Sequence, residues 1–234
     1  MKFASPLIRV QLIRRYKRFL ADVRSPDGGE FTVHTPNTGS MAGCAEPGSF
    51  IWIRDAANPK RKYRYTWELS ETADGTLIGV NTILANHLVR EAINDKVIAP
   101  LVGYEQVRAE VAYGAERSRI DFLLEDARRG RCYVEVKNVT ASVGEVAIFP
   151  DAVSARGTRH LRELGAMVAQ GHRGVILFCI QRGDVSAFRP ALEIDPLYAE
   201  TLQQVTAEGV EALAYQAAVD STEIKLIKPL PVAV

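Results

Sequence analysis

The stretch SRIDFLLEDARRGRCYVEVKNVT, residues 118–140, decides the fold of this chain. It contains two strand-like runs, 119–124 and 131–139, which are rich in apolar residues and are joined by a short charged turn. Because the side chains of a strand alternate between its two faces, these runs predict an antiparallel hairpin that turns about Arg128. We expect the other segments of the chain to assemble around this hairpin.

Three ionisable residues stand among the apolar residues of the predicted hairpin. Glu135 and Lys137 share one face of the second run, and pairing about Arg128 places Asp121 opposite or diagonal to Glu135. Two carboxylates beside an ammonium group are costly to bury unless a metal ion or an anionic substrate balances them. Two carboxylates that hold Mg²⁺ or Mn²⁺, with a lysine to assist the attacking water, suit phosphodiester hydrolysis. The alternative interpretation is a cross-strand ion pair on a solvated sheet surface.

The composition is that of ordinary globular protein. The 234 residues are 47% hydrophobic and 24% charged, which is enough apolar material for one large domain or two modest ones. Lys and Arg number 29 against 28 Asp and Glu, so a nucleic-acid surface must be a local patch. The three cysteines lack the spacing of a zinc site and predict reduced thiols. No run resembles a signal peptide or a membrane span, and we expect a soluble, cytoplasmic protein.

Residues 1–80 consist of short strand-like runs separated by turn formers. The runs are 7–13, 16–23, 31–34, 50–53, 64–69 and 76–80. Clusters of Gly, Pro, Asn and Asp lie between them. Five or six strands in a segment of this length predict an OB-like β-barrel. An open antiparallel sheet packed on the rest of the chain is the alternative.

Residues 81–234 alternate between helical and strand-like patterns. Apolar residues recur at helical spacing in 82–95, 152–170 and 196–208. Strand-like runs occur at 104–113, 174–181, 210–219 and 223–228, in addition to the central hairpin. This order predicts an α/β domain with a mixed sheet, so that the whole chain is a mixed α+β protein of two domains.

Two basic runs in the predicted barrel are interleaved with aromatic residues. The candidates for nucleic-acid contact that they supply are Arg15, Lys17, Lys60, Arg61, Lys62 and Arg64. Single strands are bound by cations along the phosphate backbone and by rings under the bases, so this composition suits a nucleic-acid groove. Taken alone, each run is equally explained as a solvated charged surface.

Two sets of helix residues have two interpretations each. Glu91 is either a third metal ligand or an exposed partner for a neighbouring basic residue. Arg156 and Arg159, together with His160, either grip a phosphate backbone or form a polar helix face. Asp151 is expected near the N-cap of the helix at 152–170. His34, His87 and His172 have no acidic or cysteine partners nearby in sequence and are interpreted as structural.

Longer segments resemble a known family. They are RVQLIRRYKRFLADV (9–23), HTPNTGSMAGCAEPGS (34–49), KRKYRYTWEL (60–69), YGAERSRIDF (113–122), YVEVKNVT (133–140) and FPDAVSARGTRHLREL (149–164). Through them the chain resembles the sugar fermentation stimulation protein A family of bacteria and archaea over nearly its whole length. The resemblance implies an N-terminal OB-type domain, residues 1–80, followed by a PD-(D/E)xK nuclease-like domain, residues 81–234.

The resemblance also implies roles for single residues. Asp121 matches the aspartate of the PD-(D/E)xK motif, Glu135 its second acid and Lys137 its lysine, while Glu91 is the candidate acid of the preceding helix. Ile120 stands where the motif has proline, a departure that leaves the ligands in place.

Two functions follow. In the first, the protein is a Mg²⁺- or Mn²⁺-dependent nuclease that acts on DNA, with RNA open as a substrate. In the second, which the family resemblance implies, it is a DNA-binding regulator that stimulates maltose metabolism, and the nuclease-like domain is a scaffold. No helix-turn-helix is apparent in the sequence, so a regulator would have to read bases in another way.

Overall fold

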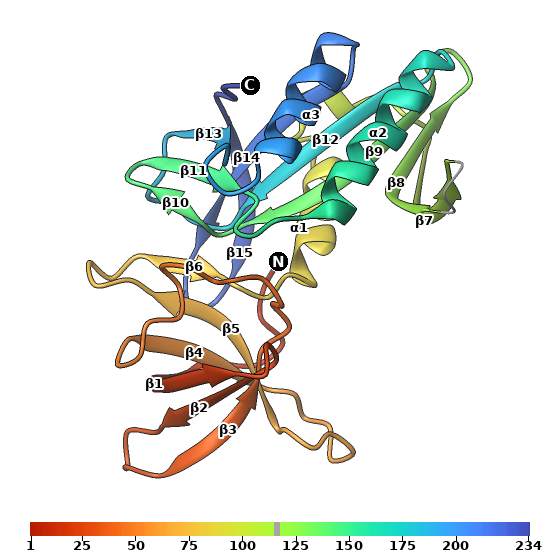
Figure 1. The fold of residues 1–234 in the computed structure, drawn as a ribbon. Coiled ribbons are helices and arrows are strands. Elements are labelled where there is room, and N and C mark those ends of the chain that lie inside the picture. Colours follow the sequence, from red (N-terminus) through yellow and green to blue (C-terminus); the bar gives the residue numbers. More distant parts are fainter. Residues whose placement is uncertain (115–117) are drawn as a thin grey trace.

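Figure 1 shows a barrel of strands at one end of the molecule and a larger domain of helices and strands at the other. This computed structural model describes residues 1–114 and 118–234. Residues 115–117, which belong to one of the segments that carry the family resemblance, lie outside the described residues. The N-terminus lies beside the junction of the two parts, and the C-terminus lies at the far end of the larger domain.

The first part is a closed barrel. Its strands are β1 (Ile8–Tyr16), β2 (Leu20–Arg24), β3 (Glu30–His34), β4 (Phe50–Asp55), β5 (Tyr65–Glu71) and β6 (Leu77–Gly79). They are ordered β3-β2-β1-β4-β5-β6, and β3 also pairs with β5 through His34 and Thr66, which closes the sheet on itself. A buried apolar cluster that includes Val10, Ile53 and Trp67 fills the interior. The predicted OB-like barrel is therefore confirmed, and the open sheet is excluded.

One turn lies later than the sequence pattern predicts. The predicted strand at 16–23 would have carried the basic run onto β2, but β1 continues to Tyr16 and pairs with Leu20. Lys17 and Arg18 therefore occupy the tight β1–β2 turn, where both have positive φ angles of 49° and 62°. Local alternation could not reveal this, because the basic residues suit a strand edge and a turn equally.

The larger domain contains a mixed six-stranded sheet. Its elements are α1 (Leu84–Asn94), a 3₁₀ turn (Ala99–Leu101), β7 (Gln106–Tyr113), β8 (Ser118–Asp126), β9 (Gly130–Val139), α2 (Ala155–Ala169), β12 (Arg173–Ile180), α3 (Pro196–Ala207), β14 (Glu211–Val219) and β15 (Ile224–Leu230). The strand order is β15-β14-β12-β9-β8-β7. β12 is parallel to both β9 and β14, whereas the outer pairs are antiparallel. The predicted mixed sheet and α+β class are confirmed.

Helices cover both faces of this sheet. On β12, Val175, Leu177 and Cys179 pack into the cluster that contains the apolar residues of α1. The alternate residues of β12 pack into the cluster formed with α2 and α3. This is the period-two pattern of a strand buried on both sides. No helix among the described residues combines the length and the apolar character that crossing a membrane requires.

Three short strands were not predicted. β10 (Ser142–Val143), β11 (Val146–Phe149) and β13 (Ala187–Pro190) form a small separate sheet. Strands of two to four residues are too short for a periodicity to be recognised. The predicted helix at 152–170 begins only at Ala155, because Ser154 caps it by accepting a hydrogen bond from the Gly157 amide.

The cysteines are buried and unpaired. Cys44 lies in the barrel core, and Cys132 and Cys179 lie under α1. Burial raises the pKa of Cys44 and Cys132 to about 11 and that of Cys179 to about 12. The thiolate is the nucleophilic form of cysteine, so none of these side chains is poised for nucleophilic catalysis at neutral pH.

Candidate active site

The hairpin opens at the predicted acidic residues. β8 and β9 pair in register from Asp126 with Gly130 to Phe122 with Val134, and no further. Just beyond the last pair, the main-chain amide of Val136 donates to the side chain of Asp121, at 2.7 Å from Oδ2. The alternation of β8 also breaks here, because Ile120 packs on the α2 side and Phe122 on the α1 side. The strands thus separate at the point where the two carboxylates meet.

Glu135 is held by two basic side chains on the α2 face of the sheet. Lys137 Nζ donates to Glu135 Oε1 at 2.6 Å, and His160 Nδ1 of α2 contacts the same oxygen. Arg156 Nε donates to His160 Nε2 at 3.3 Å. Since an arginine can only donate, Nε2 is the acceptor, and Nδ1 carries the proton that is donated to Glu135. His160 therefore fixes the position of Glu135 and faces inward.

Asp121 lies on the other side of the opening. Its Oδ1 accepts from Asn86 Nδ2 of α1 at 2.7 Å, and its Oδ2 accepts from the Val136 amide. Burial, together with the negative charge of Glu135, raises the pKa of Asp121 to about 6, although both hydrogen bonds oppose the shift. Ionising Asp121 is thus more costly than ionising Glu135, and a bound cation would reduce that cost.

Glu135 has the opposite electrostatic balance. Its burial favours the neutral acid, but the hydrogen bond from His160 and the charge of Lys137 outweigh burial and lower its pKa. Only 3% of the residue is exposed. At neutral pH the site therefore holds a buried carboxylate whose charge one neighbouring ammonium already balances.

The donor set fits a hard divalent cation. Glu135 Oε2 is buried, and no described residue gives it a hydrogen bond. An orphaned buried carboxylate oxygen is rare in proteins unless an ion or water completes it. The described residues contain no group of three or more His, Cys, Asp or Glu placed to bind a metal ion. Mg²⁺ nevertheless commonly binds through one or two carboxylates and keeps several waters, so the two carboxylates of Asp121 and Glu135 are enough protein ligands for Mg²⁺.

Glu91 is not brought to this group. Its Oε1 lies 2.8 Å from the N-terminal ammonium of Met1, which also donates to the carbonyl of Ile224. The α1 residues that face Asp121 are Asn86, His87 and Arg90, which line one cavity of about 540 Å³ with it. Asn86, and not the predicted Glu91, is thus the α1 residue that contacts Asp121. His87, which is interpreted from the sequence as structural, is exposed and lines the same cavity.

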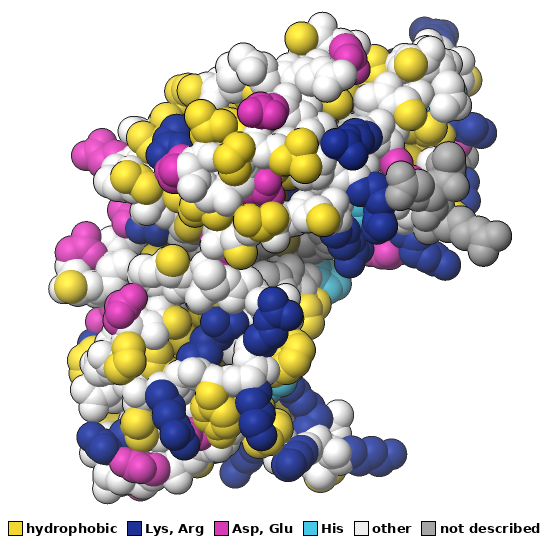
Figure 2. Space-filling view, in the orientation of Figure 1, with side chains coloured by type: hydrophobic (Ala, Val, Ile, Leu, Met, Phe, Trp, Pro, Cys, Tyr) yellow, Lys and Arg dark blue, Asp and Glu magenta, His cyan; other side chains and the backbone are white. Residues whose placement is uncertain are grey.

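Three exposed lysines of the barrel lie on the turn or loop between two strands. Lys17 is in the β1–β2 turn, and Lys60 and Lys62 are in the β4–β5 loop. All three side chains are exposed, and no described acid forms an ion pair with them. In OB folds these two loops border the oligonucleotide-binding face. Figure 2 shows Lys and Arg side chains on both sides of the hollow between the barrel and the larger domain.

Three other predicted contacts from the barrel are already engaged. Arg64 pairs with Asp55 at 2.7 Å, and Arg61 donates to Thr66 Oγ1 at 3.0 Å. Arg15 donates to four main-chain carbonyls, those of Arg18, Asn37, Gly39 and Ser40. Arg15 therefore supports loops, whereas Arg64 and Arg61 keep part of their surface beside the exposed lysines.

The two α2 arginines that were predicted to contact phosphate lie in different surroundings. Arg156 is exposed and contacts His160, which in turn contacts Glu135. Arg159 is half-buried, within electrostatic range of Tyr113. Arg156 is the one that stands at the edge of the active site.

Comparison with known proteins shows the family of the chain. Residues 83–223 match the family model described as the sugar fermentation stimulation protein RE domain, and residues 13–80 match that of the SfsA N-terminal OB domain. The chain belongs to the sugar fermentation stimulation protein family. A homologue from Thioalkalivibrio sulfidiphilus is 60% identical over 92% of this chain and 90% of its own length. One from Geobacter metallireducens is 56% identical over 99% of each chain.

A solved member of the family has the same fold. The structure of Pyrococcus furiosus SfsA in complex with Ca²⁺ covers 100% of this chain and 98% of its own, with a TM-score of 0.90 and 30% identity. The fold described above is thus that of a solved sugar fermentation stimulation protein.

Two functional residues were missed or misread in the sequence. Asn86 carries no signal that separates it from other helix amides, and only the packing of α1 reveals it. The sequence groups His160 with Arg156 and Arg159, but as a candidate for contact with phosphate. Its spacing of four from Arg156 correctly indicates one helix face, and burial shows that this face points at Glu135.

Proposed function

We propose that this protein is a metal-dependent phosphodiesterase that cleaves DNA, with Asp121 and Glu135 holding Mg²⁺ or Mn²⁺ and Lys137 assisting the attacking water. The observation that supports this best is that the half-buried Asp121, the buried Glu135 and the ammonium of Lys137 lie within electrostatic range of one another where the pairing of β8 and β9 ends. Such a group is costly to bury without a ligand, and one oxygen of Glu135 receives no hydrogen bond from the residues that the structure describes. The Ca²⁺ named with the Pyrococcus furiosus relative is a hard cation that prefers the same oxygen ligands.

Each residue has a task in this proposal. When bound, the metal supplies Lewis acidity and charge neutralisation at the phosphate. Asn86 and the Val136 amide orient Asp121, and His160 orients Glu135. Lys137 Nζ holds the attacking water and stabilises the charge that develops on the phosphate oxygens. Arg156, exposed at the edge of the site, contacts a neighbouring phosphate.

DNA is the proposed substrate because the barrel carries exposed lysines on the two loops that border the oligonucleotide-binding face of OB folds. Lys17, Lys60 and Lys62 have no ion-pair partner among the described acids and are available to neutralise phosphates. The barrel and the active site would hold one strand between them. The cleavage assay includes RNA as an alternative substrate.

A second candidate is a DNA-binding regulator without catalysis, as the role in maltose metabolism would require. The Lys137–Glu135 pair favours it, because the ammonium and the carboxylate already neutralise each other at 2.6 Å. The absence of a third acid among the described ligand-type residues also favours it. In that case the basic loops would bind DNA, and the site would be an ion pair retained in a scaffold.

A cleavage assay separates the two candidates. Wild-type protein is incubated with single-stranded, duplex and branched DNA and with RNA, with Mg²⁺, with Mn²⁺ and with EDTA. We expect metal-dependent cleavage by the wild type, loss of cleavage in Glu135→Ala, and unchanged DNA binding. Glu125→Ala, on the same hairpin but in a surface pair with Arg108 and Arg131, is the control and should cleave normally. Tight binding without cleavage in wild type would favour the regulator.

A further inference from the structure

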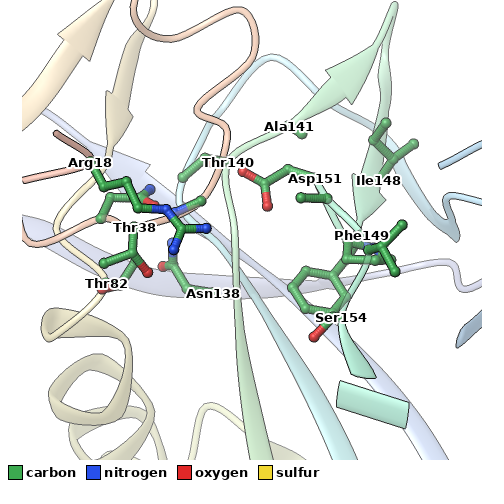
Figure 3. A pocket seen from close by; sticks show the side chains of 15 residues that line it. Arg18, Thr38, Thr82, Asn138, Thr140, Ala141, Ile148, Phe149, Asp151 and Ser154 are labelled. Atoms are coloured by element: carbon green, nitrogen blue, oxygen red, sulfur yellow. The ribbon is translucent and has the colours of Figure 1, made fainter. Parts of the chain in front are cut away.

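A second cavity lies between the barrel and the larger domain, next to the active site. It measures about 410 Å³, and both domains contribute to its wall. Figure 3 shows Arg18 reaching into it from the barrel, opposite Asp151 and Phe149 of the larger domain. Thr82 and Asn138 line both this cavity and the one that contains Asp121, so the two spaces adjoin. A ligand in this cavity therefore lies beside the proposed catalytic group.

The barrel side of the cavity is rigid. The guanidinium group of Arg15 joins the Arg18 turn to the loop of Asn37 and Gly39 by hydrogen bonds to their carbonyls, at 2.9 to 3.0 Å. The turn itself places two successive residues, Lys17 and Arg18, at positive φ, as tight β-hairpin turns do. Arg18 is thus presented from a turn that both the hairpin and the hydrogen bonds of Arg15 hold in place.

The opposite wall is fixed to the barrel across the junction. Asp151 Oδ2 accepts from Ser40 Oγ and from the Met41 amide, both at 3.1 Å. A Cβ atom on Gly39 would lie 2.5 Å from the same oxygen, so the two walls meet as closely as glycine permits. Asp151 was expected to be near the helix N-cap, but it joins the domains instead.

Three polar groups at the cavity have hydrogen-bonding capacity to spare. No described residue forms a hydrogen bond or ion pair with the guanidinium group of Arg18. Asn138 uses its carbonyl oxygen on Gln181, which leaves its amide NH₂ available. Asp151 has its Oδ1 free of hydrogen bonds from described residues. The cavity therefore offers a cation, an amide donor and a carboxylate acceptor.

This combination selects the chemistry of the ligand. A simple polyanion would be repelled by Asp151, and an apolar ligand would leave Arg18 and Asn138 without hydrogen-bond partners. A nucleotide satisfies all three, because its phosphate is anionic while its base carries N–H donors and ring acceptors. The half-buried ring of Phe149 adds an aromatic surface to the wall. The volume lies in the range of pockets for small ligands, which one nucleotide fills and a base pair does not.

We propose that this interdomain cavity binds one unpaired nucleotide next to the scissile phosphate, so that the substrate is single-stranded or carries a single-stranded segment. Arg18 holds its phosphate, and Asn138 and Asp151 bond to the edge of its base, which is accessible only when the base is unpaired. This inference rests on the proposed function, because it names the substrate class of that site.

Binding without cleavage tests the inference. Fluorescence anisotropy in EDTA compares a blunt duplex with the same duplex carrying a single-stranded overhang. We expect the wild type to prefer the overhang roughly tenfold, the scale of one well-placed base contact. Ala152→Trp, at an exposed position of the cavity wall, fills the space and should abolish the preference while leaving blunt-duplex affinity unchanged. Ala73→Trp, exposed on the β5–β6 turn, is the control and should keep the preference.

Arg18→Ala provides a second variant that removes a contact without adding bulk, and it should also reduce the preference. Equal affinity of the wild type for both duplexes, or a preference that survives in Ala152→Trp, would overturn the inference. A preference that depends on the cavity in a protein that never cleaves would support this inference and contradict the proposed function. Failure to bind either duplex would contradict both.

Discussion

At the scale of single residues, the proposed chemistry depends most on Glu135. One of its oxygens is shared by Lys137 and His160, and the other has no hydrogen bond from any described residue. His160 is in turn oriented by Arg156. Partners that orient metal-ligating carboxylates are part of the function of a site, because they fix the geometry that the metal and the substrate require.

His160→Phe tests this positioning role. An aromatic ring slightly larger than imidazole is kept, but the hydrogen bond to Glu135 is lost, so we expect cleavage to fall by about 10- to 100-fold. Mg²⁺ should be needed at higher concentration, a change that loss of stability alone does not produce. His172→Phe, whose ring packs on Tyr133 away from Glu135, is the control and should leave the Mg²⁺ dependence unaltered. Equal Mg²⁺ dependence in wild type and His160→Phe would rule out the positioning role.

The raised pKa of Asp121 makes the stability of the metal-free protein depend on pH. The ordinary aspartate pKa of 3.8 becomes about 6 in the fold, so the folded state binds this proton more tightly than the unfolded state does. Stability is therefore lost as pH rises from about 4 to about 6, on the order of 2 to 3 kcal/mol. Asp121→Asn has no such proton and should lack the loss.

Urea unfolding in EDTA across this pH range measures the difference. The stability of Asp121→Asn relative to wild type should increase between pH 4 and pH 6 and then level off. A difference between the two proteins that stays constant with pH would show that Asp121 ionises with its ordinary pKa.

Among the elements, the β4–β5 loop is the one that we expect to govern affinity for DNA. Lys60 and Lys62 are exposed on it and have no ion-pair partner among the described acids, whereas Arg64 is already paired with Asp55. Replacing Lys60 and Lys62 by Ala should weaken binding to every sequence and reduce the slope of log K against log salt by about 2. Lys228→Ala, on the edge strand β15, should change neither quantity. An unchanged slope in the loop variant would show that the DNA-binding surface does not include this loop.

The sequence predicted these elements unevenly. The two-residue period correctly placed Glu135 and Lys137 on one face. The register of the hairpin puts Asp121 level with Glu135, although the pairing of the strands ends at Phe122 with Val134. The break in alternation at Asp121 was not predictable, because it arises from a hydrogen bond to Val136 on the other strand. Glu91 and Asn86 lie on the same helix, and only the way that α1 packs on the sheet decides which of them faces the site.

At the scale of the whole molecule, the barrel and the larger domain are joined through buried polar contacts. The Gly79 amide donates to the Gln181 carbonyl at 2.8 Å, and Ile78 and Arg182 form a bridge beside it. Cys44 Sγ donates to the Thr140 carbonyl across the same junction. These contacts hold the two walls of the interdomain cavity at a fixed separation. Sequence patterns describe one segment at a time and gave no sign of them.

Gly79→Ala tests the junction. A Cβ atom at Gly79 would lie 2.2 Å from Gln181 Oε1 and 3.1 Å from its Cβ, so the Gln181 side chain must move. We expect a loss of about 1 to 3 kcal/mol, which corresponds to a fall in Tm of roughly 2 to 10 °C. Gly183→Ala is the control, because nothing lies within 4 Å of its added Cβ. Equal Tm values for the two variants, measured by calorimetry, would show that the junction is not tightly packed.

The central claim is that Asp121 and Glu135 together bind a divalent cation. Titration with Mn²⁺, with the free ion followed by its electron paramagnetic resonance signal, tests this most directly, since it requires no substrate. We predict one site in the wild type, weakened by roughly tenfold or more in Glu135→Gln and in Asp121→Asn, and unchanged in Glu125→Gln. Binding of Mn²⁺ with equal affinity to wild type and Glu135→Gln, or no binding to wild type, would contradict the account.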